Sequence, residues 1–290
     1  MIVSDIQKEK AELFLKYHHD KDILVLLNSW DAGSSRLIEA IGYKAIATTS
    51  MGIAASSGYP DCQVIQLSEM IETITRIVNS VRVPVTVDVE AGYGNSLDEI
   101  VDSAKKVIAT GIVGINIEDS IDLNPVLIDE MEFCERISAI RALSDSLGFH
   151  LVINARTDSF YTSAGSAEEK LSEAIRRGNK YREAGADCIF VQPVWQKEMI
   201  ATLVKEIHAP INILANPGIG AGVPPSVREL QDLGVARLSL GSGLMKATLA
   251  LIKKVADELS ERGTYNTLMD TLTPLPEAAM AYKMAIGESK

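Results

Sequence analysis

Short apolar, β-branched runs alternate with longer amphipathic segments along the whole 290-residue chain. Segments between the runs space apolar residues three and four positions apart and often end at glycine, as amphipathic helices do. Strands that alternate with helices pair in parallel through right-handed crossovers. The pattern therefore predicts an α/β protein, a (β/α)8 TIM barrel. The eight predicted strands begin at Ile23, Ala45, Pro84, Val113, His150, Asp187, Ile211 and Ala236.

A doubly wound open sheet is the main alternative to the barrel. That fold usually carries a GxGxxG phosphate-binding turn directly after its first strand. Here the first strand runs into "NSWDAGSS", residues 28–35, and the glycine-rich "NPGIGAGV", residues 216–223, follows the seventh strand instead. The barrel is therefore the favoured architecture.

The two ends of the chain differ from this alternation. The first 22 residues predict a charged amphipathic helix, on which we expect His18 and His19 to be exposed to solvent. The alternation stops after about Glu261. Residues 1–262 are therefore predicted to form the barrel domain with its N-terminal helix. Residues 263–290 are predicted to form an apolar helical extension that packs on the barrel or on a partner subunit.

Composition excludes several classes of protein. The formal net charge is −11, which argues against a surface for nucleic acid or an anionic membrane. No apolar run reaches the ~18 residues that a membrane span needs. The three cysteines, Cys62, Cys134 and Cys188, form no CxxC pair, so neither a disulfide framework nor a zinc ribbon is indicated. The N-terminus lacks the apolar core of a signal peptide. A soluble, cytoplasmic protein is predicted.

Ionisable residues gather at the predicted C-terminal ends of consecutive strands: Asp61, Asp88, Glu90, Glu118 and Arg156. Active sites of TIM barrels lie at that end. Asp88 and Glu90 are two residues apart and point to one side of their strand. Two carboxylates facing an apolar helix layer would be costly, so we expect them at the barrel mouth. Carboxylates without histidine or cysteine suit Mg²⁺, with Mn²⁺ possible.

Each of these residues also has a purely structural interpretation. A single acid at a strand end is often a helix N-cap or an ion-pair partner. Arg156 has the corresponding alternative of a structural ion pair with Asp158 or Glu118. The metal interpretation rests on the four acids together.

Four motifs, in this order, carry a resemblance to a known family: "TTSMGIAASSGYPD", "DVEAGYGN", "GINIEDS" and "NARTD". The region from about Leu27 to Gly243 resembles the phosphoenolpyruvate mutase/isocitrate lyase superfamily, and most closely its phosphonomutase-like branch. The resemblance implies a barrel whose last helix is exchanged between subunits of a homo-oligomer, a dimer or tetramer. It also implies Mg²⁺ that holds a small anionic 2-oxo or 2-hydroxy acid or a phosphonate.

The resemblance also implies roles for the acids. Asp88 would be the direct metal ligand, and Asp61, Glu90 and Glu118 would hold the water shell of the metal. Asp61 and Glu118, with Arg156, are the predicted catalytic residues.

Substrate binding is implied for a second set of residues. The backbone amides of Ser50 and Met51, with the side chain of Thr49, would bind the substrate carboxylate. Arg156 would bind substrate oxygens and stabilise developing charge, since its fork matches a carboxylate or phosphonate. Gln192 ends the sixth strand, where mutases of this family place a histidine.

The chain departs from the family in the loop after the fourth strand. That loop carries neither the cysteine motif of the isocitrate lyases nor the gate of the mutases, and Cys134 is predicted to lie on a helix as a buried thiol. We therefore favour a reaction that needs only metal, arginine and an enolate, such as decarboxylation of oxaloacetate. P–C chemistry on phosphonopyruvate is the alternative.

Two further classes stay open. A Schiff-base aldolase needs a lysine at a strand end, whereas Lys180 and Lys197 fall in helical segments. A non-catalytic ligand-binding barrel is the other possibility, although a site without a function has no reason to keep a cluster of like charges.

Overall fold

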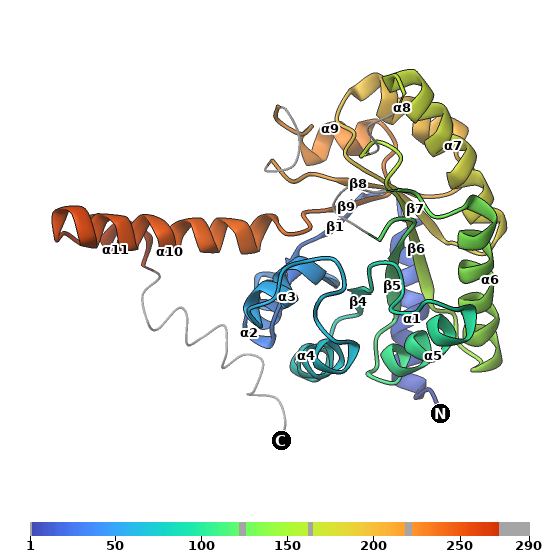
Figure 1. The fold of residues 1–290 in the computed structure, drawn as a ribbon, viewed down its shortest axis with the longest axis horizontal. Coiled ribbons are helices and arrows are strands. Elements are labelled where there is room, and N and C mark those ends of the chain that lie inside the picture. Colours follow the sequence, from blue (N-terminus) through green and yellow to red (C-terminus); the bar gives the residue numbers. More distant parts are fainter. Residues whose placement is uncertain (1, 122–125, 162–164, 218–221, 273–290) are drawn as a thin grey trace.

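Nine parallel strands form one sheet in the computed structural model, which describes residues 2–121, 126–161, 165–217 and 222–272. Their order around the sheet is β1-β9-β8-β7-β6-β5-β4-β3-β2. Helices surround this sheet on the outside (Figure 1). The strands are β1 Leu24–Leu26, β2 Asn28–Ser29, β3 Ile46–Thr48, β4 Val85–Asp88, β5 Gly114–Glu118, β6 Val152–Thr157, β7 Cys188–Val191, β8 Ile211–Leu214 and β9 Arg237–Ser239.

The predicted first strand is divided in two, and the division closes the barrel. β1 pairs with β9, and β2 pairs with β3. At this seam the Asn28 side chain donates to the Thr48 carbonyl at 2.8 Å and accepts from the amides of Leu240 and Gly241 at 2.9 and 2.8 Å. Since β1 and β2 are separated by one residue, Leu27, the sheet runs full circle. The predicted (β/α)8 barrel is confirmed, with one strand in two pieces.

Helices follow the strands in the expected alternation. Serine hydroxyls cap several of them at their first turn, because each accepts from an otherwise unpaired amide of that turn, as Ser96 does for α5 and Ser166 for α7. The helices are α1 Asp5–Tyr17, α2 Ala32–Ile41, α3 Ser50–Ser56, α4 Leu67–Ser80, α5 Leu97–Ile108, α6 Glu130–Ser146, α7 Ala167–Glu183, α8 Lys197–Glu206, α9 Val227–Asp232, α10 Gly243–Arg262 and α11 Asn266–Thr271.

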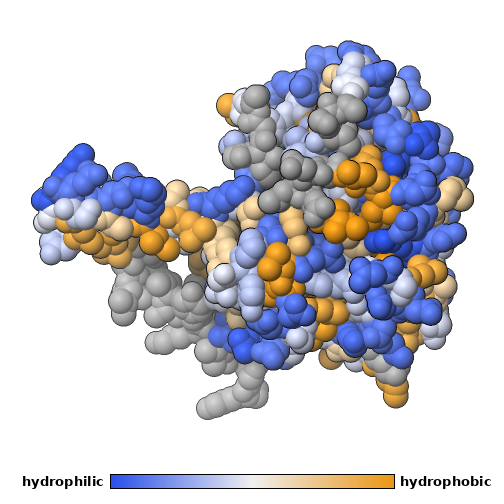
Figure 2. All heavy atoms as spheres, in the orientation of Figure 1, coloured by the Kyte–Doolittle hydropathy of each residue, from blue (hydrophilic) through white to orange (hydrophobic). Residues whose placement is uncertain are grey.

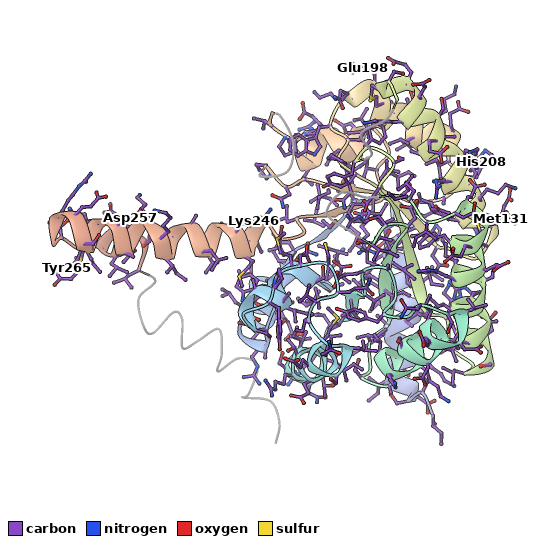
Figure 3. The ribbon with its side chains drawn as sticks, in the orientation of Figure 1. Met131, Glu198, His208, Lys246, Asp257 and Tyr265 are labelled. Atoms are coloured by element: carbon purple, nitrogen blue, oxygen red, sulfur yellow. The ribbon has the colours of Figure 1, made fainter. Side chains whose placement is uncertain are left out.

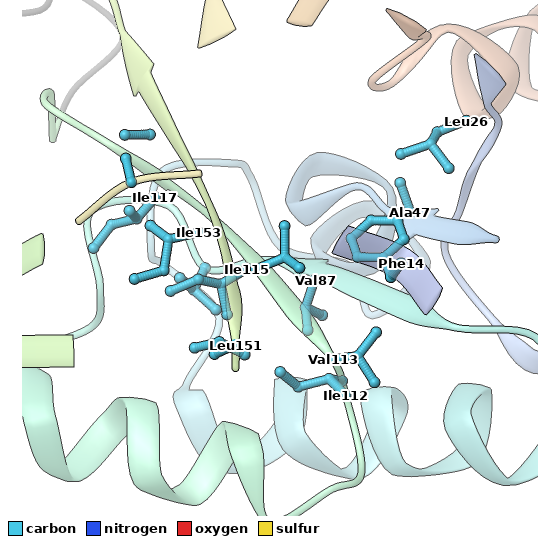
Figure 4. Close-up of a cluster of buried hydrophobic side chains, with 14 of the residues drawn as sticks. Phe14, Leu26, Ala47, Val87, Ile112, Val113, Ile115, Ile117, Leu151 and Ile153 are labelled. Atoms are coloured by element: carbon cyan, nitrogen blue, oxygen red, sulfur yellow. The ribbon is translucent and has the colours of Figure 1, made fainter. Parts of the chain in front are cut away.

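The main hydrophobic core fills the layer between the sheet and the helices. In β4, Val85 and Val87 belong to this core, whereas Thr86 and Asp88 line the interior of the barrel. Ile115, Ile117 and Ile153 of the neighbouring strands lie in the same cluster (Figure 4). Strand side chains alternate between two faces, so one face supplies the core and the other is free for chemistry.

The interior of the barrel is polar. TIM barrels usually fill this space with branched apolar side chains. Here Asn116 and Asn154 are buried inside, and Asn154 donates to Asn116 at 2.7 Å. Asn212 and Ser239 are buried as well, 3.3 Å apart. The polar interior leads from the mouth deep into the barrel.

α1 packs against the barrel, and this corrects one expectation about its histidines. The apolar face of α1 buries Ala11 and Phe14, and the Phe14 ring reaches Gly114 of β5, where a Cβ would come within 2.9 Å of it. His18 lies one turn after Phe14 and is 2% exposed, so its predicted exposure is wrong. His19 is exposed as expected. Helical spacing explains the difference, because residues four apart share a face.

α10 leaves the barrel body as a long arm (Figures 1 and 3). Lys246 lies at its root, and Asp257 and Tyr265 lie toward its far end (Figure 3). Apolar side chains gather on one side of the arm (Figure 2), and the exposed ones are Leu249, Leu251, Ile252 and Leu259. α10 ends at Arg262, and the division into a barrel domain and an extension at this point stays a prediction.

Most of the predicted extension lies outside the described residues, which end at 272. α11 turns back on the end of α10, where the Glu258 carboxylate accepts from the amides of Asn266 and Thr267. Within the part of the chain that the structure describes, no helix is long and apolar enough to cross a membrane.

Candidate active site

A cavity of about 240 Å³ opens at the C-terminal ends of the strands. In a TIM barrel this end is where the loops bring catalytic residues together. The structure places every residue of the predicted site at this cavity: Thr49, Ser50, Met51, Asp61, Asp88, Glu90, Glu118, Arg156 and Gln192.

Asp88 lies at the end of β4 and is surrounded by hydrogen-bond donors. Its Oδ2 accepts from the Ser50 hydroxyl at 3.0 Å, and its Oδ1 accepts from the Asn116 amide at 3.1 Å. The Ser50 hydroxyl also lies 3.4 Å from Asp61. Asp61 and Asp88 are thus brought to one hydroxyl from loops that are far apart in the sequence. Both acids keep oxygen atoms toward the cavity.

Glu90, which lines the same cavity, links the loop that contains Gln63 to the loop that follows β4. It accepts from the amide of Gln63 at 2.6 Å and from the Tyr93 hydroxyl at 2.9 Å. Its backbone φ is 51°, and the φ angles of Cys62, Gln63 and Tyr93 are also positive. Non-glycine residues rarely adopt this conformation, and such residues cluster at functional sites.

Like charges crowd this end of the cavity. Burial, with the charge of Asp88, raises the pKa of Asp61. Burial, with the charges of Asp88 and Asp61, raises the pKa of Glu90 to about 7. These carboxylates are costly to keep ionised together without a cation between them.

Arg156, at the end of β6, is held by two acids. Its Nε donates to Asp158 Oδ1 at 2.6 Å and its Nη2 to Asp158 Oδ2 at 2.9 Å, and Nη1 forms an ion pair with Glu118. The Gln192 amide lies against the same guanidinium, and the amide orientation that matches its donors turns the oxygen to Nη2 at 2.7 Å. Burial alone would lower the pKa of Arg156, but Asp158 and Glu118 outweigh it and hold the pKa well above its ordinary value.

These contacts correspond to the structural alternative for Arg156. They do not remove it from the site, because Arg156 lines the cavity with Glu118. A fixed guanidinium next to an open space is preorganised for a developing negative charge.

The residues after β3 begin α3 and also contact the acids of the cavity. The Thr49 side chain is the N-cap of α3 and accepts from the Gly52 amide at 3.4 Å. The Ser50 amide lies 3.4 Å from Asp88. Thr49, predicted to bind the substrate carboxylate with its side chain, thus has a structural partner. The Ser50 and Met51 amides lie in the first turn of α3, which has only seven residues.

The donor set suits a hydrated hard cation better than a directly chelated one. Among the described residues, no three histidine, cysteine or acidic side chains are close enough to hold a metal by themselves. Mg²⁺ usually keeps several waters and takes only one or two protein carboxylates. Asp88 as the ligand, with Asp61 and Glu90 toward its waters, fits that chemistry, and a cation there would offset the repulsion that raises their pKa values.

Several residues that line the cavity or support it were missed by sequence reasoning. Asn116 and Asn154 stand two positions before Glu118 and Arg156, on the same faces of β5 and β6, so strand alternation could have found them. Tyr161, Cys62 and Lys246 come from loops or from the start of α10, where strand alternation gives no signal. Cys134, by contrast, lies on α6 as predicted, partly buried, and does not line the cavity.

Comparison with known proteins gives consistent relatives. The phosphoenolpyruvate phosphomutase family matches residues 14–260. An uncharacterized protein of Mycobacterium tuberculosis H37Rv is 32% identical over 86% of this chain and 89% of its own length. The 2-methylisocitrate lyase of Escherichia coli K12 is 29% identical over 86% of this chain and 84% of its own.

Solved structures agree with this match. The crystal structure of a putative lyase/mutase from Burkholderia cenocepacia J2315 superimposes with a TM-score of 0.87 at 29% identity, over 95% of this chain and 97% of that one. The family match covers most of the barrel, including all of the strand ends that form the cavity. The chain belongs to the phosphoenolpyruvate mutase family, within the phosphoenolpyruvate mutase/isocitrate lyase superfamily.

Proposed function

We propose that this protein is a soluble, cytoplasmic, Mg²⁺-dependent lyase that acts on a small 2-oxo or 2-hydroxy carboxylic acid through an enolate. Decarboxylation of oxaloacetate is the favoured reaction. The observation that carries the proposal is the meeting of Asp61, Asp88 and Arg156 in one cavity at the barrel mouth. Acidic oxygens and a fixed cation in one cavity suit a substrate that carries both a metal-chelating group and a leaving carboxylate.

The acids would hold the metal, with Mn²⁺ as a possible substitute for Mg²⁺. Asp88 would bind it directly, and Asp61, Glu90 and Glu118 would hold its waters. When bound, the cation would polarise the 2-oxo group and stabilise the enolate. Ser50 and Asn116 keep the Asp88 carboxylate oriented through their hydrogen bonds.

Arg156, on β6, would bind the substrate one strand away from β5 and two from the β4 strand that carries Asp88. Its guanidinium is fixed by Asp158 and Glu118, so little reorganisation is needed as charge develops. The Gln192 amide, on the same guanidinium, would orient the substrate oxygen that Arg156 contacts. The Ser50 and Met51 amides would bind the second substrate carboxylate.

Tyr161 would supply the proton that completes the reaction. Loss of CO₂ leaves the electron pair on the α-carbon of the enolate, and one proton then gives the 2-oxo acid product. Tyr161 lines the cavity, and burial raises the pKa of its hydroxyl to about 12, so that it carries its proton at neutral pH. Solvent is the other source of this proton.

P–C bond chemistry on phosphonopyruvate is the second candidate, because a phosphonate would fit the same guanidinium and metal. A ligand-binding barrel without catalysis would bind these acids and leave them unchanged. Lys246 reaches the cavity from α10 rather than from a strand end. Trapping with borohydride and pyruvate would therefore test the aldolase class at one defined lysine.

A substrate screen separates these candidates. Oxaloacetate, dimethylmalate-like acids and phosphonopyruvate would each be incubated with the protein, with and without Mg²⁺, and products followed by NMR. We expect Mg²⁺-dependent loss of CO₂ from oxaloacetate. Release of phosphate from phosphonopyruvate would favour the second candidate, and binding without turnover of any acid would favour the third.

The arm formed by α10 supports a further part of the proposal, a homo-oligomer with exchanged C-terminal helices. Its exposed leucines and Ile252 form an apolar surface that a single chain leaves in water. The apolar tail from Tyr265 onward would be buried against the partner in the same exchange. We therefore expect a chain ending at Glu261, which keeps the apolar residues of α10 but lacks this tail, to lose oligomeric mass or solubility in light scattering. An unchanged mass with full solubility would count against the exchange.

A further inference from the structure

Arg237 lies deep inside the barrel and has no acidic partner. It begins β9, is 2% exposed, and lines the same cavity as the acids of the mouth. Its guanidinium lies 5.9 Å from the centre of the Phe14 ring, and its Nη1 lies 3.5 Å from His18 Nε2. Among the described residues no carboxylate comes within ion-pair distance of it.

The groups nearest to Arg237 carry no charge. His18 Nδ1 lies 2.8 Å from the Phe14 carbonyl, which can only accept, so Nδ1 holds the proton and Nε2 faces Arg237 as an acceptor. Burial and Arg237 lower the pKa of His18 to about 3. Burial raises the pKa of the Cys188 thiol to about 12. At neutral pH both side chains are therefore neutral.

The acids in the surroundings are engaged elsewhere. Asp187, next to Cys188 in sequence, forms ion pairs with Arg141 at 2.6 Å and with His150 at 2.7 Å. Asp88 acts on Arg237 only through space and is bound by Ser50. A buried cation without a paired anion is costly, and proteins rarely keep one without a partner.

Unused donors point into the same space. Within the described part of the chain, Arg237 Nε and Thr86 Oγ1 are buried and have no hydrogen-bond partner. Both residues line the cavity, as do Asn212 and Ser239, the polar pair of the neighbouring strands. A guanidinium nitrogen only donates, and a hydroxyl donates or accepts. This donor set is suited to an anion.

We propose that the floor of the barrel, formed by Arg237, Thr86, Asn212 and Ser239, is a binding site for a small monovalent anion. The ligand chemistry is that of a halide or a single carboxylate group. The anion comes either from solution or from a ligand whose second carboxylate reaches down the cavity. Because the buried cation exists whatever the enzyme catalyses, this site does not rest on the proposed reaction.

The test measures anion binding without turnover. Thermal unfolding of the full chain would be followed as sodium chloride replaces sodium methanesulfonate, which is neither a halide nor a carboxylate, at constant ionic strength. We expect chloride to raise the midpoint in a saturable way, and Arg237→Met to weaken that chloride binding by about tenfold or more. Arg176→Met, on the exposed face of α7, is the matched control and should respond as the wild type does. An equal response of the wild type and Arg237→Met would overturn the proposal.

Succinate distinguishes the two sources of the anion. If a ligand carboxylate occupies the floor, chloride and Arg237→Met should both weaken succinate binding in calorimetry. If only a free inorganic anion binds there, chloride should bind and succinate affinity should stay the same. Either result supports the site, provided that the chloride effect requires Arg237.

A wild-type crystal soaked in sodium bromide covers the case in which Arg237→Met does not fold. We expect an anomalous bromide peak beside the Arg237 guanidinium. Its absence at saturating bromide would overturn the proposal, and bromide bound only at surface positions would count as the same negative result.

Discussion

The mouth and the floor of the barrel use the same inward positions of the strands but treat charge in opposite ways. At the mouth, acids outnumber cations, and each is held by neighbours, as Asp88 is by Ser50 and Asn116. At the floor, within the described residues, the cation Arg237 lies beside neutral His18, and the Arg237 Nε and the Thr86 hydroxyl have no hydrogen-bond partner. The cavity that joins the mouth and the floor therefore carries an excess of acidic side chains at the mouth and a positive charge at the floor.

The difference shows how position along one strand decides chemistry. Thr86 and Asp88 are two residues apart on β4. Asp88 bonds Ser50 of the mouth, whereas the Thr86 hydroxyl has no hydrogen-bond partner in the described structure. Loops at the C-terminal ends supply donors that the strands alone do not. The mouth is where we propose that a cation and a substrate bind, and the floor is where we propose that an anion binds.

The largest expected effect is at the mouth. Asp88→Ala should abolish turnover and Mg²⁺ binding, because the proposed direct ligand is lost while the surrounding acids remain. Asp98→Ala, an exposed acid in the first turn of α5, is the matched control and should keep both. Equal Mg²⁺ affinity of wild type and Asp88→Ala by calorimetry would contradict the assignment of Asp88 as a metal ligand at the mouth.

Arg156→Lys should reduce kcat/KM by two orders of magnitude or more. Lysine keeps the charge but cannot reproduce the fork that bonds Asp158 at two atoms and also reaches Glu118. Steady-state kinetics measure the effect, and Arg176→Lys on α7 serves as the control. A loss of less than tenfold would mean that the guanidinium is only structural, as its ion pairs alone would suggest.

The floor should respond to acid through His18. Its pKa is lowered to about 3 in the folded protein, so only the unfolded chain takes up a proton below its ordinary value of 6.5. The stabilisation is complete above that value and is lost as the pH falls. Between pH 6.5 and pH 5 the folded protein should lose about 2 kcal/mol of this stabilisation, since one pKa unit corresponds to ~1.4 kcal/mol.

Chemical unfolding of His18→Gln should show a smaller loss of stability over this pH range than the wild type. His19→Gln is the matched control, because His19 is the exposed neighbour. The same slope in wild type and His18→Gln would contradict a buried, neutral His18 beside Arg237.

The smallest expected effect is that of Cys134→Ser. The thiol lies on α6 outside the cavity, so turnover should change by less than tenfold, or about 1.4 kcal/mol of barrier. Cys62→Ser is the informative partner, because Cys62 does line the cavity. If Tyr161 or solvent supplies the proton, both variants stay active. A folded but inactive Cys134→Ser would restore a thiol-dependent lyase.

The sequence by itself determined the barrel and most of its mouth. Strand alternation gives one face of β4 to the core and the other to Asp88, and the order of motifs identifies the family. These features depend on local spacing, which the chain carries without knowledge of its contacts. Strand spacing accounts in this way for Asp88 and Glu118 at the cavity, whereas Asp61 and Glu90 reach it from loops, Glu90 with a positive φ.

Tertiary structure alone decided which groups met across the barrel. Asn28 closes the seam because β9 ends beside it, and His18 is buried because α1 packs against the strands. Arg237 has the sequence context of an ordinary strand residue, and only its three-dimensional surroundings leave its Nε without a hydrogen-bond partner among the described residues. Such contacts join residues up to 219 positions apart, as His18 and Arg237 are, and depend on burial and distance, which spacing along the chain does not fix.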